Sequence, residues 1–376
     1  MSDELEQETQ SQLQLQKLPL DATHRALEAT MGAEGGWEVP LSYSGALDEA
    51  AETRRLASVF DMSHVGRIRI RGRDALSLVE KLCTSDVVHQ EDDTVAATLL
   101  LNESGGVLAD AMIARLDGFW LLTTDPCNRT KVLAHGAEVA GEMSVKIDDQ
   151  TDKGAMLAVT GPAACEILDS ILPENPGDLP AGATRIGSMM IARYIVMRTS
   201  FTGMWGLEVI LPKMFIAKAW RFITDKAGEK ALKPSGIAAR DILRIEAGLC
   251  RYGHELNETI DPITAGLESL IDYDHEFIGR DALVAIRDKG VSRKRVALSL
   301  EGTAIPRQGD TVFNSEGVEV GSITSGTFSP ALDSPIAMAY ISLAASDSGE
   351  SMEVHLASVD KKVSATIIDL PPVAQN

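Results

Sequence analysis

Alternating apolar and polar positions predict strands in the first third of the chain. Arg67–Arg71 alternates basic and apolar residues, a pattern typical of a strand with one buried face. Apolar runs predict three further strands at Val95–Leu101, Val107–Leu116 and Phe119–Thr124. The Gly pair within residues 102–106 supplies the positive φ values of a tight turn, so the first two runs should form an antiparallel hairpin.

A second unit of strands and helices follows. Short apolar strands are predicted at Met156–Val159, Met189–Met197 and Leu207–Leu211. Leu18–Tyr43 mixes Gly, Trp and Pro, which favours an ordered loop rather than a regular element. Helix-forming composition and capping residues predict helices at Ala46–Leu56, Asp74–Leu82, Gly161–Leu172, Met214–Ala227 and Ile237–Ala247.

The pattern changes after Arg293, where short strands and turns replace helices. Such spacing is typical of a small β-barrel or sandwich, here over residues 293–371. The charged run Arg287–Arg295 favours a solvated linker before it. Residues 18–286 should form two subdomains that break near 150–160, behind a disordered leader at 1–17. The expected fold class is therefore α+β.

Charge and composition narrow the class of partner and the compartment. The 376 residues include 55 acidic and 35 basic side chains, a formal net charge of −20. Such a chain repels nucleic acid, and an aromatic content of 5% offers few base-stacking side chains. The N-terminus lacks the basic and apolar regions of a signal peptide, and no apolar run reaches the length of a membrane span. We expect a cytoplasmic protein with no nucleic-acid partner and no membrane partner.

The sequence also lacks the local motifs of several common enzyme classes. It has no Gly-rich phosphate loop, no dinucleotide-binding fingerprint, no HExxH and no Gly-x-Ser-x-Gly elbow. The four cysteines lie far apart without a CxxC pair, so neither a metal site nor a disulfide framework is expected. Nucleotide hydrolysis, nicotinamide chemistry, zinc hydrolysis and serine hydrolysis are disfavoured. A site assembled from distant segments stays open.

Six segments, taken in order, resemble one known family. They are Gly36–Tyr43, Phe60–Gly66, Leu101–Asp110, Thr202–Glu208, Gly236–Leu249 and Ile323–Pro330. Together they resemble the aminomethyltransferase (T-protein) family of the glycine cleavage system, over the chain from Leu18 to Pro371. The resemblance implies a three-domain cloverleaf fold with antiparallel sheets, a C-terminal β-barrel-like domain and a central cavity that binds tetrahydrofolate.

The resemblance also implies an activity and a partner. Members of that family take an aminomethyl group from the lipoyl arm of the H-protein, release ammonia and pass the one-carbon unit to tetrahydrofolate. An aminomethyl thioether that loses ammonia becomes an iminium-like electrophile, which the folate nitrogens capture. A carboxylate beside those nitrogens can orient the pterin, stabilise developing positive charge and accept a proton.

Three residues match functional positions of that family. Asp110 matches its catalytic aspartate, the second acid of a usual Asp-Asp pair. Glu208 matches the acid that holds the pterin, since a carboxylate accepts two parallel hydrogen bonds from an amine and an adjacent ring N–H. Arg240 matches an arginine near the benzoyl-glutamate or pterin region, where a guanidinium can fork to a carboxylate or carbonyl.

The sequence departs from the family pattern around these positions. Ala109 replaces the first acid of the pair, Phe201 replaces a Tyr, and Met204 replaces a Glu. Asp125 stands where an Asn is usual, and an aromatic residue expected near Ala97 to stack on folate is absent. We expect Asp125 and Phe201 to take part in folate binding, with rearranged or weaker contacts than in the family.

Several alternatives stay open. A folate-dependent demethylase of a small methylated substrate belongs to the same superfamily, as does a folate-binding non-enzyme, whose Lys-Gly-Cys signature is missing here. Arg244 lies one helical turn beyond Arg240 and is the candidate for a structural ion pair with Asp241 or Glu246. Candidate cationic surfaces for the H-protein are Arg287–Arg295 and Arg67–Arg73.

Overall fold

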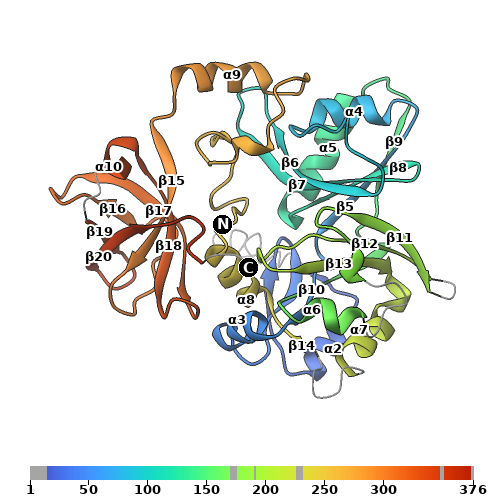
Figure 1. Cartoon of the computed structure of the whole chain (residues 1–376), viewed down its shortest axis with the longest axis horizontal. Helices are drawn as coiled ribbons and strands as arrows, with labels where there is room; N and C mark the ends of the chain where they lie inside the picture. Colours follow the sequence, from blue (N-terminus) through green and yellow to red (C-terminus); the bar gives the residue numbers. More distant parts are fainter. Residues whose placement is uncertain (1–14, 170–175, 190–191, 226–231, 348–350, 374–376) are drawn as a thin grey trace, which may run out of the picture.

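The computed structural model describes residues 15–169, 176–189, 192–225, 232–347 and 351–373. Figure 1 shows the C-terminal barrel as a lobe on one side, with two larger sheets and their helices on the other. Helix α8 (Ile237–Glu246) lies between them and contacts both the N-terminal strand β3 and the barrel strand β17. This mixture of helices, antiparallel sheets and a closed barrel confirms the expected α+β class.

The first sheet is antiparallel throughout, in the order β6-β7-β8-β5-β9. The β6–β7 hairpin turns at Gly105, whose φ is +83°, and Gly106 follows because the Glu258 carbonyl approaches it too closely for a Cβ. Helices α4 and α5 cover one face through a shared apolar core. The bounds are β5 (Gly66–Gly72), β6 (Thr94–Leu101), β7 (Val107–Leu116), β8 (Phe119–Thr124), β9 (Val145–Asp149), α4 (Ala75–Leu82) and α5 (Arg129–Ala140).

The second sheet has the order β11-β12-β13-β10-β4-β14, antiparallel except for the β4–β14 pair. Helices α6 and α7 pack on one of its faces, where Trp220 is almost fully buried. The bounds are β4 (Ser58–Asp61), β10 (Gly154–Thr160), β11 (Thr184–Met189), β12 (Ala192–Met197), β13 (Gly206–Pro212), β14 (Lys233–Pro234), α3 (Ala46–Arg55), α6 (Ala164–Asp169), η2 (Pro176–Asp178), η3 (Lys213–Phe215) and α7 (Ile216–Asp225).

Two smaller structures complete the fold. A three-stranded sheet at the N-terminal end has the order β1-β3-β2, and six strands close the C-terminal barrel in the order β15-β18-β17-β16-β19-β20. Their elements and the connecting helices are β1 (Gln16–Lys17), α2 (Asp21–Ala26), β2 (Thr30–Glu34), β3 (Trp37–Ser42), η1 (Pro126–Asn128), η5 (Glu268–Leu270), α9 (Arg280–Lys289), β15 (Arg293–Leu300), β16 (Thr311–Phe313), β17 (Glu319–Ser329), β18 (Ser334–Ser342), α10 (Leu343–Asp347), β19 (Met352–Leu356) and β20 (Lys361–Ile368).

The uncovered faces of the two large sheets pack against each other. Ala114 of β7 and Leu121 of β8 share one buried core with Met156 of β10 and Met197 of β12. Side chains alternate between the two faces of a strand, so every second residue of β7, β8, β10, β12 and β13 points into this layer. The layer between the sheets is where the candidate site lies.

Several sequence-based expectations are confirmed, and others are wrong. The strands predicted at Val107–Leu116 and Phe119–Thr124 occur at those bounds. The loop expected at Leu18–Tyr43 is wrong, because α2, β2 and β3 occupy it. Residues 16–17 pair with β3, so the expected disorder is wrong there; residues 1–14 of the leader lie outside the described residues.

The linker expected at Arg287–Arg295 is also wrong. Helix α9 continues to Lys289 and strand β15 begins at Arg293, which leaves only residues 290–292 between them. Asp74 precedes α4 as expected, but its carboxylate accepts the Ser144 N–H at 2.7 Å and caps no N–H of the helix. The domain boundaries 18–286 and 293–371 stay predictions.

The second unit differs from its prediction in detail. Helix α6 begins at Ala164, and the predicted end at Leu172 lies outside the described residues. Strand β12 begins at Ala192 and pairs with β11, a strand that the sequence pattern missed. Among the described residues, no helix is long and apolar enough to cross a membrane.

Candidate functional site

The register of the first sheet places two carboxylates side by side. Ala111 of β7 pairs with Thr124 of β8, so the next positions along the two strands are Asp110 and Asp125. The Thr124 hydroxyl donates to the Asp110 carbonyl at 2.8 Å. Just beyond β8, the Asp125 carboxylate accepts the Cys127 N–H at 3.0 Å and begins the short helix η1. Asp110 and Asp125 are therefore opposite each other, at the adjoining ends of β7 and β8.

The Asp110 carboxyl is held in an environment that favours its neutral form. Its Oδ1 is buried and has no hydrogen-bond partner among the described residues. Burial raises the pKa of Asp110 to about 6, the charge of Asp125 adds to the rise, and Arg240 and Arg251 oppose it. A carboxyl with this pKa can exchange a proton near neutral pH.

Glu208 is the most buried acid of the site. It lies on β13, its residue is 1% exposed, and neither carboxylate oxygen has a hydrogen-bond partner within the described part of the chain. Burial raises the pKa of Glu208 to about 7, against the effects of the Thr199 hydroxyl and the Arg240 guanidinium. An isolated protein gains nothing from two unpaired buried oxygens, because each loses its hydration without compensation.

A recess opens beside Glu208. It is narrow, with a volume of about 10 Å³, and its walls include Phe60, Met62, Phe201 and Arg240. The Arg240 guanidinium lies over the Phe201 ring, 4.4 Å from the ring centroid, and its Nε has no hydrogen-bond partner among the described residues. Burial lowers the pKa of Arg240, and the Asp125 carboxylate opposes this change. The structure thus brings Glu208, Phe201 and Arg240 together around one recess.

His64 is a candidate site residue that the sequence reasoning missed. The side chain is fully buried, and neither ring nitrogen has a hydrogen-bond partner in the described residues. Burial lowers the pKa of His64 to about 4, the Arg240 charge adds to the effect, and Asp61 and Asp125 oppose it, so the imidazole is neutral. The segment Phe60–Gly66 pointed to the region, but an isolated histidine carries no spacing signal of its own.

Arg251 is a second residue that the sequence reasoning missed. Its guanidinium forms an ion pair with Glu34 at the end of β2 and lies 3.7 Å from Asp241. Its charge reaches both Asp110 and Arg240. No local pattern around Arg251 could have shown this, because Glu34 lies 217 residues away along the chain.

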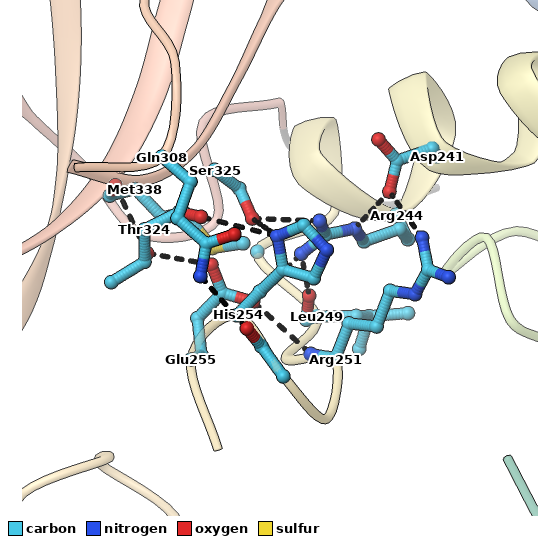
Figure 2. A network of polar contacts seen from close by, with 12 residues as sticks. Asp241, Arg244, Leu249, Arg251, His254, Glu255, Gln308, Thr324, Ser325 and Met338 are labelled. Carbon is cyan, nitrogen blue, oxygen red and sulfur yellow. Dashed lines mark hydrogen bonds and ion pairs between the residues drawn. The ribbon is translucent and has the colours of Figure 1, made fainter. Parts of the chain in front are cut away.

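Arg244 joins helix α8 to the barrel, as Figure 2 shows. Its guanidinium donates to Asp241 at 2.8 Å, to Glu255 at 2.8 Å and to the Ser325 hydroxyl at 2.7 Å. The structural ion pair with Asp241 is therefore confirmed. The alternative pairing of Arg244 with Glu246 is wrong.

Glu246 has other partners. Its carboxylate accepts Nε of Arg54, from helix α3, at 2.5 Å and also the Ser329 hydroxyl of the barrel. These bonds, with those of Arg244, tie the barrel to α8, the helix that carries Arg240.

The run Arg67–Arg73, one of the two cationic runs expected to dock the H-protein, is not a continuous surface patch. Arg67 is fully buried, and its guanidinium donates to backbone carbonyls of Val65, Ser63, Thr151 and Gly154. It cannot contact a partner, so the run Arg67–Arg73 is wrong as a continuous docking surface. Within the described residues, no group of three or more His, Cys, Asp or Glu side chains could hold a metal ion.

Comparison with known proteins identifies the family. The GCVT N-terminal domain family matches residues 20–275, and the glycine cleavage T-protein C-terminal barrel domain matches residues 293–373. The aminomethyltransferase of Caldanaerobacter subterraneus subsp. tengcongensis is 33% identical over 361 residues, which is 94% of this chain and 95% of that protein. The aminomethyltransferase of Moorella thermoacetica is 36% identical over 344 residues, covering 91% and 94% of the two chains.

A solved structure agrees with these matches. The crystal structure of glycine cleavage system aminomethyltransferase T from Bartonella henselae superposes with a TM-score of 0.88 and 30% sequence identity, over 96% of this chain and 98% of that one. The resemblance found in the six segments is confirmed, and the relatives favour a transferase over the demethylase and the non-enzyme. The chain belongs to the T-protein, or aminomethyltransferase, family of the glycine cleavage system.

Proposed function

We propose that the chain transfers the one-carbon unit of an aminomethyl group from the lipoyl arm of the H-protein to tetrahydrofolate. The C–S and C–N bonds of the donor break, and two C–N bonds to the acceptor form. The two protons that leave the acceptor amines go to the released thiol and to the released ammonia, so no oxidant or reductant is needed. Tetrahydrofolate supplies the two amine nitrogens that accept the carbon. A cytoplasmic location stays a prediction from the sequence.

Unpaired buried polar atoms carry this proposal. Both Glu208 oxygens, Oδ1 of Asp110 and Nε of Arg240 are buried without a hydrogen-bond partner among the described residues. Native proteins rarely leave such groups unpaired, so each atom points to a ligand that completes it. Two adjacent N–H donors, as on a pterin ring, would satisfy Glu208, and an acceptor would satisfy Arg240. The donor set of the recess therefore fits a reduced folate.

Asp110 is the residue that we assign to the chemistry. With a pKa of about 6, it is ionised in most molecules above neutral pH, yet it remains basic enough to accept a proton from the acceptor amine. Its negative charge would also stabilise positive charge that develops on the donor carbon. The neighbouring carboxylate of Asp125 strengthens both effects, which gives a role to an acid found where the family usually has Asn.

Phe201 takes over part of the role of the Tyr that the family usually has. Its ring supports the Arg240 guanidinium from 4.4 Å, and this contact needs only the aromatic face and no hydroxyl. We assign Glu208, Arg240, Phe201 and Asp125 to folate binding.

The test compares Asp110→Asn with the wild type in ammonia release and methylenetetrahydrofolate formation from aminomethylated H-protein. We expect turnover to fall by about a hundredfold or more, because the base is lost while the shape is kept. Folate affinity, measured separately by calorimetry, should change little. The matched control is Asp117→Asn, an exposed acid in the turn between β7 and β8, which should leave turnover unchanged.

Two results would contradict the proposal. Wild-type turnover that does not depend on folate would show that tetrahydrofolate is not the acceptor. Equal turnover in Asp110→Asn and the wild type would show that the Asp110 carboxyl has no catalytic role.

A further inference from the structure

Thr199 is a residue of the recess to which the proposed function gives no role. It follows the end of strand β12 by two residues and lines the same recess as Glu208 and Arg240. Its hydroxyl oxygen is buried and has no hydrogen-bond partner among the described residues. Buried hydroxyl groups in native proteins are usually paired, so this oxygen requires an explanation.

The sheet register places Thr199 diagonally across from Glu208. Met197, the last residue of β12, pairs with Glu208 of β13. The chain continues alongside β13 beyond this pair, because a Cβ added to Gly206 would lie 2.7 Å from the Thr199 carbonyl oxygen. Residues two apart along a strand share a face, so the side chains of Thr199 and Glu208 lie on one face as diagonal neighbours.

The other three hydroxyl side chains that line the recess already have partners. The Thr160 hydroxyl lies 2.7 Å from the Thr202 hydroxyl, and the Ser200 hydroxyl lies 2.9 Å from that of Thr202. These contacts anchor the segment after β12 to β10. Within the described part of the chain, Thr199 therefore has the recess hydroxyl that is available to the Glu208 carboxylate.

The charge state of Glu208 gives such a hydroxyl a use. Burial raises the pKa of Glu208 to about 7, and the Thr199 hydroxyl and the Arg240 guanidinium oppose the rise. The other described residues that line the recess are uncharged, and so are Met197 and Ala158, which pair with Glu208 from β12 and β10. A protonated carboxyl has one carbonyl acceptor, whereas two adjacent pterin N–H groups need both oxygens as acceptors. An ionised Glu208 therefore binds the pterin better.

We propose that Thr199 is a positioning residue of the folate site, whose hydroxyl donates to the Glu208 carboxylate and holds it ionised and facing the pterin. This inference rests on the proposed function, which sets a pterin against Glu208. In the ligand-free protein, the hydroxyl is near enough to affect the titration of Glu208 but makes no complete hydrogen bond to it. Hydrogen bonds of active sites often tighten only when the ligand binds.

The test follows tetrahydrofolate affinity by calorimetry as the pH changes. Thr199→Val keeps the shape of the side chain and loses the hydroxyl. Its affinity at pH 6 should fall by about tenfold, because a hydrogen bond to an ionised group contributes about that factor. At pH 8.5, where Glu208 is largely ionised in both proteins, the loss should shrink to about twofold or less. Thr199→Ser, which restores the hydroxyl, should follow the wild-type profile.

Thr202→Val is the matched control, because it removes a hydroxyl of the same segment that is bonded to other hydroxyls. This substitution acts on packing alone, so its affinity should differ from that of the wild type by one constant factor at every pH. A loss in Thr199→Val that is equally constant with pH would overturn the proposal. A loss of the same size in a Glu208→Gln background would overturn it too, because Thr199 would then contact the ligand directly.

Urea unfolding of the ligand-free proteins separates this inference from the proposed function. Without the Thr199 hydroxyl, ionised Glu208 is more costly, so Thr199→Val should lose more stability than the wild type as the pH rises from 4.5 to 8.5. The difference should disappear in a Glu208→Gln background, and a difference that persists there would overturn the proposal. A wild type that binds no tetrahydrofolate but gives the expected unfolding result would reject the proposed function, while the contact between Thr199 and Glu208 would stand.

Discussion

Replacing Glu208 by Gln should make the ligand-free protein more stable, although it removes a residue assigned to binding. The carboxyl is 1% exposed and neither of its oxygens is paired within the described residues, so its ionised form is costly in the folded state. Burial raises the pKa of Glu208 from 4.5 to about 7. Gln has nearly the same shape and stays neutral at every pH, so the substitution removes the cost of ionisation and little else.

The magnitude and the pH window follow from that shift in pKa. One unit of pKa corresponds to about 1.4 kcal/mol, so ionised Glu208 costs about 3 kcal/mol of unfolding free energy above pH 7. Because the folded-state pKa is the higher one, the folded protein binds more protons than the unfolded chain between pH 4.5 and about 7. Wild-type stability should therefore fall relative to Glu208→Gln as the pH rises through this window, with no difference below pH 4.5.

Urea unfolding of the ligand-free proteins at pH 4.5, 6 and 8 measures this difference. Glu319→Gln, a substitution of an exposed acid on the barrel, is the control and should show no pH-dependent difference from the wild type. Folate should then raise the melting temperature of the wild type more than that of Glu208→Gln, since only the carboxylate accepts two hydrogen bonds from the pterin. A variant that is no more stable than the wild type at pH 8 would refute the claim that Glu208 is buried without a partner.

Substitutions of three further residues test other parts of the structure. Arg244→Met leaves the Glu255 carboxylate buried without its cation and should cost about 3–5 kcal/mol in thermal or urea unfolding; a loss below about 1 kcal/mol would contradict the structural role. His64→Leu removes two unpaired ring nitrogens, so stability should hold while folate affinity falls in calorimetry; unchanged affinity would exclude contact with the ligand. Phe201→Leu removes the ring beneath Arg240 and should weaken folate binding by about fivefold, whereas Phe201→Tyr should retain the wild-type affinity. Equal folate affinity in the wild type and both variants would show that Phe201 does not contribute to the site.

The sequence pattern predicted secondary structure correctly where short-range signals determine the conformation of a single element. The apolar runs of β7 and β8 and the Gly pair between β6 and β7 are short-range signals, and the strands and hairpin formed as expected. The prediction from sequence pattern was wrong where tertiary contacts determine the conformation of a segment. The segment at Leu18–Tyr43 has weak local preference, but its strands gain partners from each other and become a sheet. The charged run Arg287–Arg295 likewise extends α9 and β15 instead of remaining a linker.

The same contrast between local signals and tertiary contacts holds for the residues of the candidate site. Asp110, Glu208 and Arg240 were selected from motifs in the sequence, and the structure places them around one layer between two sheets. His64 and Arg251 were not selected, because their relevance comes from neighbours that are distant along the chain. Motifs report residue type and order, whereas burial and pairing depend on which surfaces meet.

By itself, the sequence determined the class of most strands and helices, the barrel at the C-terminal end, the family and three of the acidic and basic candidates. Periodicity and turn residues suffice for the strands, helices and barrel, since they act within a few positions of the chain. The family and the three candidate residues came instead from the resemblance of six segments to a known family. Only the tertiary structure decided that Asp110 and Glu208 lose their water and titrate near neutral pH, and that Arg67 is buried. Electrostatic free energies depend on solvent exposure and on distances between charges, and neither exists until the two sheets have packed face to face.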